Sequence, residues 1–150
     1  QYRGGLGYLF LESKVFELLS VYLSEVLELS ILSSSYISIS KSDRDSITEA
    51  KRIIDSQLAF APSCEELAKK VNISVSKLTK GFNSLFGTSV HAYIIDQRLE
   101  KAAGLLLESD LNVSQIATLV GYSKPSNFAA AFKKKYGVIP KNYKDENTIG

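Results

Sequence analysis

The sequence predicts an all-α protein, and three observations support this. Apolar residues recur at helical spacing over most of the 150 residues. Ser, Asn and Gly stand at positions where helices begin or end. The pattern of residues 67–87 also returns about fifty residues later. With 45% apolar and 23% charged residues, the chain can bury a core and is not expected to be disordered.

Residues 5–32 are predicted to form one long helix with a broad apolar face that includes Phe16 and Leu23. Five charged residues interrupt its apolar run, so it does not match a membrane span of about 20 uncharged residues. An apolar face must be buried, and its partner could be an upstream region, a second copy or the rest of the chain. We expect association, either in a homodimer through residues 5–32 or by docking on another domain.

The Ser-rich residues 33–45 lack a helical period and are expected to form a linker. Residues 1–40 would hold the association helix and linker, and residues 41–146 the folded domain. Because position 1 is not Met, we expect a fragment or processed product of a longer protein. No signal peptide is recognisable, so the expected compartment is the cytoplasm.

From Asp45 onward, the sequence predicts short amphipathic helices with defined ends. A first helix extends toward Pro62, and Ser63 with Glu66 forms a capping box for the next one. A three-residue turn, 72–74, leads into a helix over 75–86, and Gly87 ends it. Residues 63–87 therefore form a helix, a turn and a second helix.

A connecting helix over about 89–109 follows, and then the pattern repeats. Asn112 and Gln115 form a second capping box, 121–123 is the turn, and 124–136 is a helix that Gly137 ends. Pro125 lies in the first turn of that helix, where proline is tolerated. A shift of 49 residues superposes Ser74 on Ser123, and a shift of 50 superposes Phe82 on Phe132.

Both copies match the helix-turn-helix motif, whose second helix enters the major groove of DNA. The outward positions of the second helices are polar, basic or small, and none is acidic. In the first copy these candidates for DNA binding are Ser76, Lys77, Thr79, Lys80 and Asn83. In the second copy they are Lys124, Ser126, Asn127, Ala129, Ala130, Lys133 and Lys134. The connecting helix would span roughly 30 Å, close to the spacing of about 34 Å between successive major grooves.

The charge distribution also fits a polyanion. Residues 1–40 hold two basic and four acidic side chains, whereas residues 41–150 hold sixteen and twelve. Residues 121–144 contain six lysines and no acid, a local positive field of the kind that binds phosphate. The three consecutive lysines 133–135 are expected to contribute phosphate contacts and salt dependence. A solvated helix face is the alternative for this cluster.

Residues 98–144 resemble the signature of the AraC/XylS family of transcriptional regulators. The matching positions are Arg98, Leu99, Ile116, Ala117, Gly121, Tyr122, Phe128, Phe132, Lys134, Lys135, Tyr136, Gly137 and Pro140. The resemblance covers about residues 45–145. It implies a seven-helix domain with two helix-turn-helix subdomains that binds promoter DNA and usually activates transcription through RNA polymerase.

The resemblance also implies which residues read bases. These are Ser76, Thr79 and Lys80 in the first motif, and Ser126, Asn127, Ala129 and Ala130 in the second. The family often has Arg or another polar group where Ala129 and Ala130 stand, and Arg where Lys144 stands. Since alanine can touch a thymine methyl but cannot form a hydrogen bond with a base, the second motif is expected to position more than it specifies.

A further resemblance, in residues 2–19 and 81–90, is to the siderophore-responsive branch of the family. It implies an absent N-terminal domain that senses an effector, with a ferric siderophore as the ligand. The fragment itself is expected to need no cofactor or metal, since it has one Cys, Cys64, and one His, His91. No nucleophile and base are paired in the sequence, so an enzyme is not expected. The alternative function is a helical protein–protein interaction or dimerisation module with only non-specific DNA affinity.

Overall fold

The computed structural model describes residues 14–26 and 39–148, which belong to two separate units divided after residue 39. All described residues of the first unit up to residue 26 are helical, and every one of them is exposed. The helix predicted over 5–32 is therefore confirmed for 14–26. The rest of that prediction, and the linker residues 33–38, lie outside the described residues.

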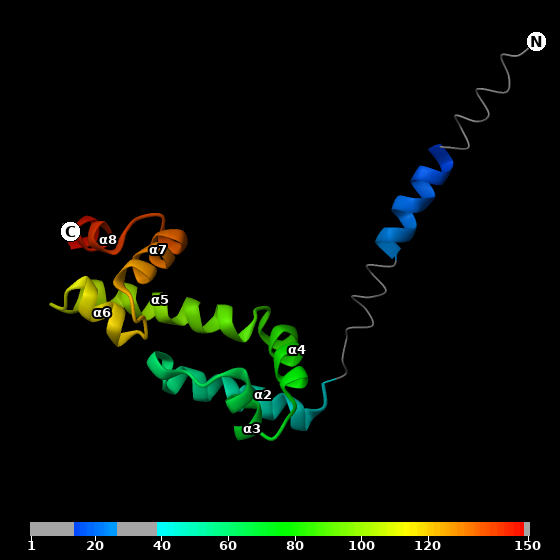
Figure 1. The fold of residues 1–150 in the computed structure, drawn as a ribbon, viewed down its shortest axis with the longest axis horizontal. Coiled ribbons are helices and arrows are strands. Elements are labelled where there is room, and N and C mark those ends of the chain that lie inside the picture. Colours follow the sequence, from blue (N-terminus) through cyan, green and yellow to red (C-terminus); the bar gives the residue numbers. More distant parts are fainter. Residues whose placement is uncertain (1–13, 27–38, 149–150) are drawn as a thin grey trace, which may run out of the picture. The chain divides into compact units, whose positions relative to one another are not determined.

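The second unit is all-helical in its described residues. It contains seven α-helices and one short 3₁₀ helix, which are α2 (Lys41–Ser56), η1 (Leu58–Phe60), α3 (Cys64–Lys70), α4 (Val75–Phe86), α5 (Val90–Glu108), α6 (Val113–Leu119), α7 (Pro125–Tyr136) and α8 (Pro140–Thr148). In Figure 1, α5 runs between the group formed by α2, α3 and α4 and the group formed by α6, α7 and α8. The predicted seven-helix fold is confirmed.

One predicted boundary is wrong. The linker predicted over 33–45 extends too far, because α2 begins at Lys41, with Ser40 as its N-cap, in agreement with the domain expected from residue 41. The Ser40 hydroxyl accepts a hydrogen bond from the backbone N–H of Asp43 at 3.1 Å. Serine and aspartate favour both turns and the first turn of a helix, so composition alone placed this boundary too late in the chain.

The predicted caps are confirmed. Ser63 accepts a hydrogen bond from the Glu66 N–H at 3.2 Å, and the Glu66 carboxylate accepts one from the Ser63 N–H at 2.9 Å. Asn112 and Gln115 form the same pair of bonds in the second copy. Gly87 and Gly137 end α4 and α7 with φ of 69° and 81°, the left-handed conformation that glycine adopts without steric cost.

Each helix-turn-helix copy has its own buried apolar cluster. In the first, Leu67, Leu78 and Phe82 are buried together with residues of α2, and Phe82 packs edge-on against Tyr93 with ring centroids 5.5 Å apart. In the second, Phe132 packs against Tyr143 of α8 at 5.2 Å. The remaining buried members of the second cluster are Leu99, Ala102, Ala103, Leu106, Ile116, Ala117, Val120 and Phe128. Because α5 contributes to both clusters, it carries the two motifs.

Candidate nucleic-acid interface

The two turns have similar backbone geometry. Asn72 in the first and Gly121 in the second adopt positive φ, 56° and 100°. The next residue then donates its N–H back to the preceding helix, from Ile73 to the Ala68 carbonyl at 3.1 Å and from Tyr122 to the Ala117 carbonyl at 2.9 Å. This places α4 and α7 in equivalent positions, as the second helices of two helix-turn-helix motifs.

All five candidates on α4 are exposed. Ser76, Lys80 and Asn83 stand at spacings of four and three, so they form one row along the helix, which we call the first outer row. It lies on the face of α4 away from buried Leu78 and Phe82. The first outer row therefore presents a hydroxyl, an ammonium and an amide to solvent, and each can donate a hydrogen bond.

The other two candidates on α4 have partners within the protein. The Lys77 ammonium lies 3.3 Å from the carboxylate of Asp43 on α2. The Thr79 hydroxyl donates to the Val75 carbonyl at 3.0 Å, which leaves its oxygen free to accept. Helix α4 has no acidic residue of its own, and the carboxylate that pairs with Lys77 comes from the neighbouring α2. Of the two lysines on α4, Lys80 is the one without an ion pair in the described part of the chain.

The second outer row is Ser126, Ala130 and Lys133, each fifty residues after its counterpart on α4. These three side chains are exposed, as are Lys124, Asn127 and Lys134. Ala129 is half-buried, because it precedes buried Phe132 by one helical turn. The expectation that Ala129 faces outward is therefore correct only in part.

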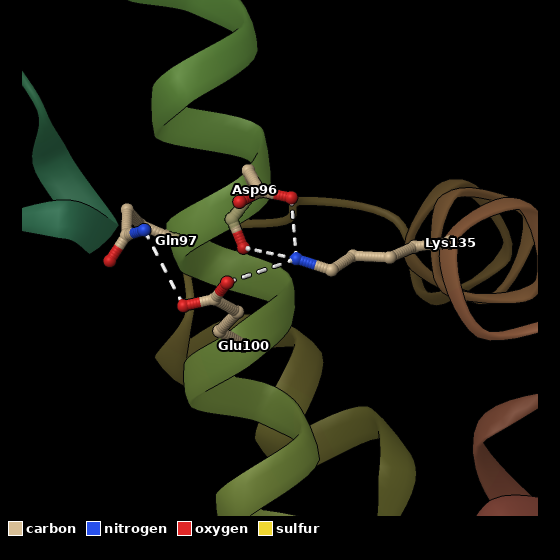
Figure 2. Close-up of polar contacts among 4 residues, drawn as sticks. All are labelled: Asp96, Gln97, Glu100 and Lys135. Carbon is tan, nitrogen blue, oxygen red and sulfur yellow. Dashed lines mark hydrogen bonds and ion pairs between the residues drawn. The ribbon is translucent and has the colours of Figure 1, made fainter. Parts of the chain in front are cut away.

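Lys135 points away from this row, toward α5 (Figure 2). Its ammonium lies 2.5 Å from the Asp96 carboxylate and 3.3 Å from that of Glu100, and its side chain is only 24% exposed. Partial burial alone would lower the pKa of Lys135, but the hydrogen bonds to the two carboxylates outweigh this and the pKa is raised. Lys135 is thus engaged within the domain, unlike Lys133 and Lys134, and its contact with phosphate stays an untested prediction.

The spacing of residues along α7 could have indicated that Lys135 lies on a different side of the helix from Lys133. Lys135 follows buried Phe128 by seven residues and buried Phe132 by three, so it stands on the inner side of α7. A long lysine can extend its stem along such a side and keep its charge paired at the tip. What spacing could not show was the partner, since Asp96 lies 39 residues away in the chain.

The described residues offer little for other chemistry. Burial, and to a lesser degree the charge of Glu65, raise the pKa of the Cys64 thiol, which disfavours the reactive thiolate. The described part of the chain contains no group of three or more His, Cys, Asp or Glu side chains that could hold a metal ion. Among its helices, none has the length and apolar content required to cross a membrane.

A family model described as a helix-turn-helix domain matches residues 67–146. The xylose operon regulatory protein of Escherichia coli (strain K12) is 32% identical over 102 residues, which is 68% of this chain and 26% of that protein. The HTH-type transcriptional regulator AlkR of Acinetobacter baylyi is 39% identical over 83 residues, 55% of this chain and 27% of that protein. The chain thus spans about a quarter of the length of these two relatives.

Two solved structures are similar to the second unit. The DNA-binding domain of the global transcriptional factor AdpA, in complex with a target DNA, is 26% identical with a TM-score of 0.64, and the match covers 67% of this chain and 90% of that one. The C-terminal domain of the response regulator yesN from Fusobacterium nucleatum is 31% identical with a TM-score of 0.61, covering 65% and 95%. The match to the yesN domain therefore extends over nearly all of a domain that was solved on its own.

Proposed function

We propose, because the chain belongs to the AraC/XylS family of transcriptional regulators, that α4 and α7 bind promoter DNA in two successive major grooves. The all-helical unit is an AraC-type DNA-binding domain. The 19 residues of α5 give a strut of about 28 Å between the motifs, compared with about 34 Å between grooves. The observation that carries the proposal is the pair of outer rows, which are exposed, free of acids and in the same register fifty residues apart.

The two rows assign different roles to the motifs. At the middle position, the first outer row has Lys80 and the second has Ala130. A lysine can donate to the O6 and N7 acceptors of guanine, whereas alanine offers only a methyl group for contact with thymine. Lys133 and Lys134 at the end of α7 suit phosphate, which positions a protein without reading sequence. We infer that the first motif supplies more of the sequence preference than the second.

The test begins with selection of an operator from random duplexes by the 150-residue chain. Thr79→Ala and Lys80→Ala should each cost roughly 1–3 kcal/mol at particular base pairs of the first half-site. Ala130→Ser should change preference little at any position, and Arg52→Ala, on α2, controls for the loss of one positive charge. A stronger base preference in the half-site bound by α7 would overturn this division of roles.

The alternative, a protein–protein interaction module with only non-specific DNA affinity, predicts a different result in the same selection. Affinity would then depend on salt but not on sequence, and no operator would emerge. Recovery of one bipartite operator excludes this alternative.

For the full-length protein we propose activation of transcription through RNA polymerase, controlled by an effector-sensing domain. The support for a further domain is that the matched regulators are nearly four times as long as the region shared with this chain. A ferric siderophore is the effector class implied by the resemblance of residues 2–19 and 81–90. Transcription from the selected operator, with and without that ligand, tests both parts, and the expected compartment remains the cytoplasm.

We also propose that residues 5–32 associate with the same residues of a second copy. In the described part of this segment, Phe16 is 71% exposed, Leu18 70% and Leu23 55%. Exposed apolar side chains this close together on a helix favour burial against a partner. The segment carries Glu17 and Glu25, which would repel phosphate, so a direct role in DNA binding is disfavoured.

A further inference from the structure

The second helix-turn-helix motif meets the first half of the domain at a contact that the proposed function does not use. The turn of the second motif, at Gly121, abuts the 3₁₀ helix η1, which joins α2 to α3 in the first half of the domain. A Cβ atom on Gly121 would lie 2.7 Å from the Ala59 carbonyl oxygen and 2.9 Å from Cζ of Arg98. Both distances are shorter than van der Waals contact, so the backbones meet with no room for a side chain.

Arg98 of α5 is the third residue at this contact, and it donates hydrogen bonds to η1. Its Nε donates to the Leu58 carbonyl at 2.8 Å, and its Nη2 approaches the Ala59 carbonyl at 3.5 Å. The guanidinium is half-buried, and it fills the space between η1 and the turn. A charged group that bonds to backbone carbonyls in such a place fixes their position more strongly than a neutral donor would. We call Ala59, Arg98 and Gly121 the inter-motif joint.

The equivalent turn of the first motif contains no glycine, and its φ of 56° is smaller than the 100° of Gly121. Asn72 occupies the position equivalent to Gly121 there. Asparagine tolerates the left-handed region better than most residues. At Gly121 the close approach of Ala59 and Arg98 adds a second demand that asparagine cannot meet. Glycine here is therefore explained by the contact between motifs, in addition to the positive φ.

We propose that the inter-motif joint sets the offset between α4 and α7, and thereby the spacing between half-sites that the domain accepts. This rests on the proposed function, in which both helices occupy major grooves. The turn at Gly121 is followed by the first residues of α7, the end of a recognition helix that reaches base edges. A displaced turn would move that end relative to α4, while each motif would keep its own apolar cluster.

The test uses Gly121→Asn in the 150-residue chain, with Gly137→Asn as the matched control. Both glycines have positive φ and lie in the second motif, but a Cβ on Gly137 would meet no atom within 4 Å. Arg98→Ala and Arg98→Lys examine the third member of the joint. Affinity is measured on the selected operator, on operators with one or two base pairs inserted or deleted between half-sites, and on each half-site alone. Each inserted pair moves the second half-site by about 3.4 Å and rotates it.

For Gly121→Asn we expect about a tenfold loss on the best-spaced operator, comparable with one mismatched base pair. Its preference among spacings should become flatter or shift, while its affinity for single half-sites and that of Gly137→Asn stay close to the original. Arg98→Ala should act in the same direction, and Arg98→Lys should restore part of the preference.

Two outcomes would overturn the proposal that the inter-motif joint sets the spacing between half-sites. One is an unchanged spacing preference in Gly121→Asn, and the other is an equal loss at every spacing and on single half-sites, which would indicate general destabilisation. If the unsubstituted chain itself shows no preference for paired half-sites, both the proposed function and the joint are wrong. That result is distinguishable, because it is seen before any residue is changed.

Discussion

Two lysines separated by one residue on α7 should affect different properties when replaced by alanine, one DNA binding and the other stability. Lys133 belongs to the second outer row and has no ion pair in the described part of the chain, whereas Lys135 is paired with Asp96 and Glu100 on α5. Lys133→Ala should therefore weaken DNA binding with little effect on stability. Lys135→Ala should lower stability with little effect on the salt dependence of binding.

The magnitude for Lys133 follows from counterion release. Each phosphate contact contributes about −0.9 to the slope of log affinity against log salt, so one lost contact makes the slope shallower by about that amount. Between 50 and 200 mM salt, the affinity of Lys133→Ala should then fall about 3.5-fold less than that of the original chain. Fluorescence anisotropy of a labelled operator over this salt range measures the slope.

The magnitude for Lys135 follows from its two ion pairs. Asp96 and Glu100 are half exposed, with side chains 50% and 55% accessible, so solvent weakens both interactions. Together they should contribute about 1 kcal/mol, which corresponds to a Tm lower by about 4 °C in Lys135→Ala for a unit of this size. Thermal unfolding followed by circular dichroism measures the shift. A shallower salt slope in Lys135→Ala, at unchanged Tm, would refute this assignment.

Three further predictions concern stability and association. The buried Tyr122 hydroxyl has no hydrogen-bond partner among the described residues, so Tyr122→Phe should leave stability unchanged or raise it by about 1 kcal/mol in urea unfolding; a marked loss would indicate a partner. Burial raises the pKa of Tyr93, Tyr122 and Tyr136, and that of Lys135 is also raised, so the folded state binds these protons more tightly. Their contribution to stability should be complete below about pH 10 and decline as pH rises through the raised values, which urea unfolding from pH 8 upward would show; constant stability over that range would contradict it. Phe16→Asp with Leu23→Asp should abolish a dimer, and deletion of residues 1–40 should leave a monomer that binds one operator; sedimentation of an intact chain that is monomeric at high concentration would contradict the association role.

Local features of this protein could be predicted from the sequence because their interactions span only a few residues. The capping box of Ser63 and Glu66 closes within three residues, and a left-handed turn at Gly137 depends on that residue alone. The start of α2 was placed too late, since the residues near Ser40 suit a linker as well as a helix start. The face of each recognition helix also followed from spacing, which is why most candidates on α4 and α7 are exposed.

The identity of partners far apart in the chain could not be predicted in this way. Lys133 and Lys135 have the same side chain, and their difference arises because α5 brings Asp96 and Glu100 beside only one of them. Lys77 likewise meets Asp43 from another helix.

The sequence by itself determined the all-helical class, the two motifs and the residues on their outer faces, since these depend on period, caps and turns that act locally. The tertiary structure alone decided which cations remain unpaired and how the motifs meet. The contact of Arg98 with Leu58 joins residues 40 apart. Such a contact depends on how whole helices pack, and no local pattern encodes that packing.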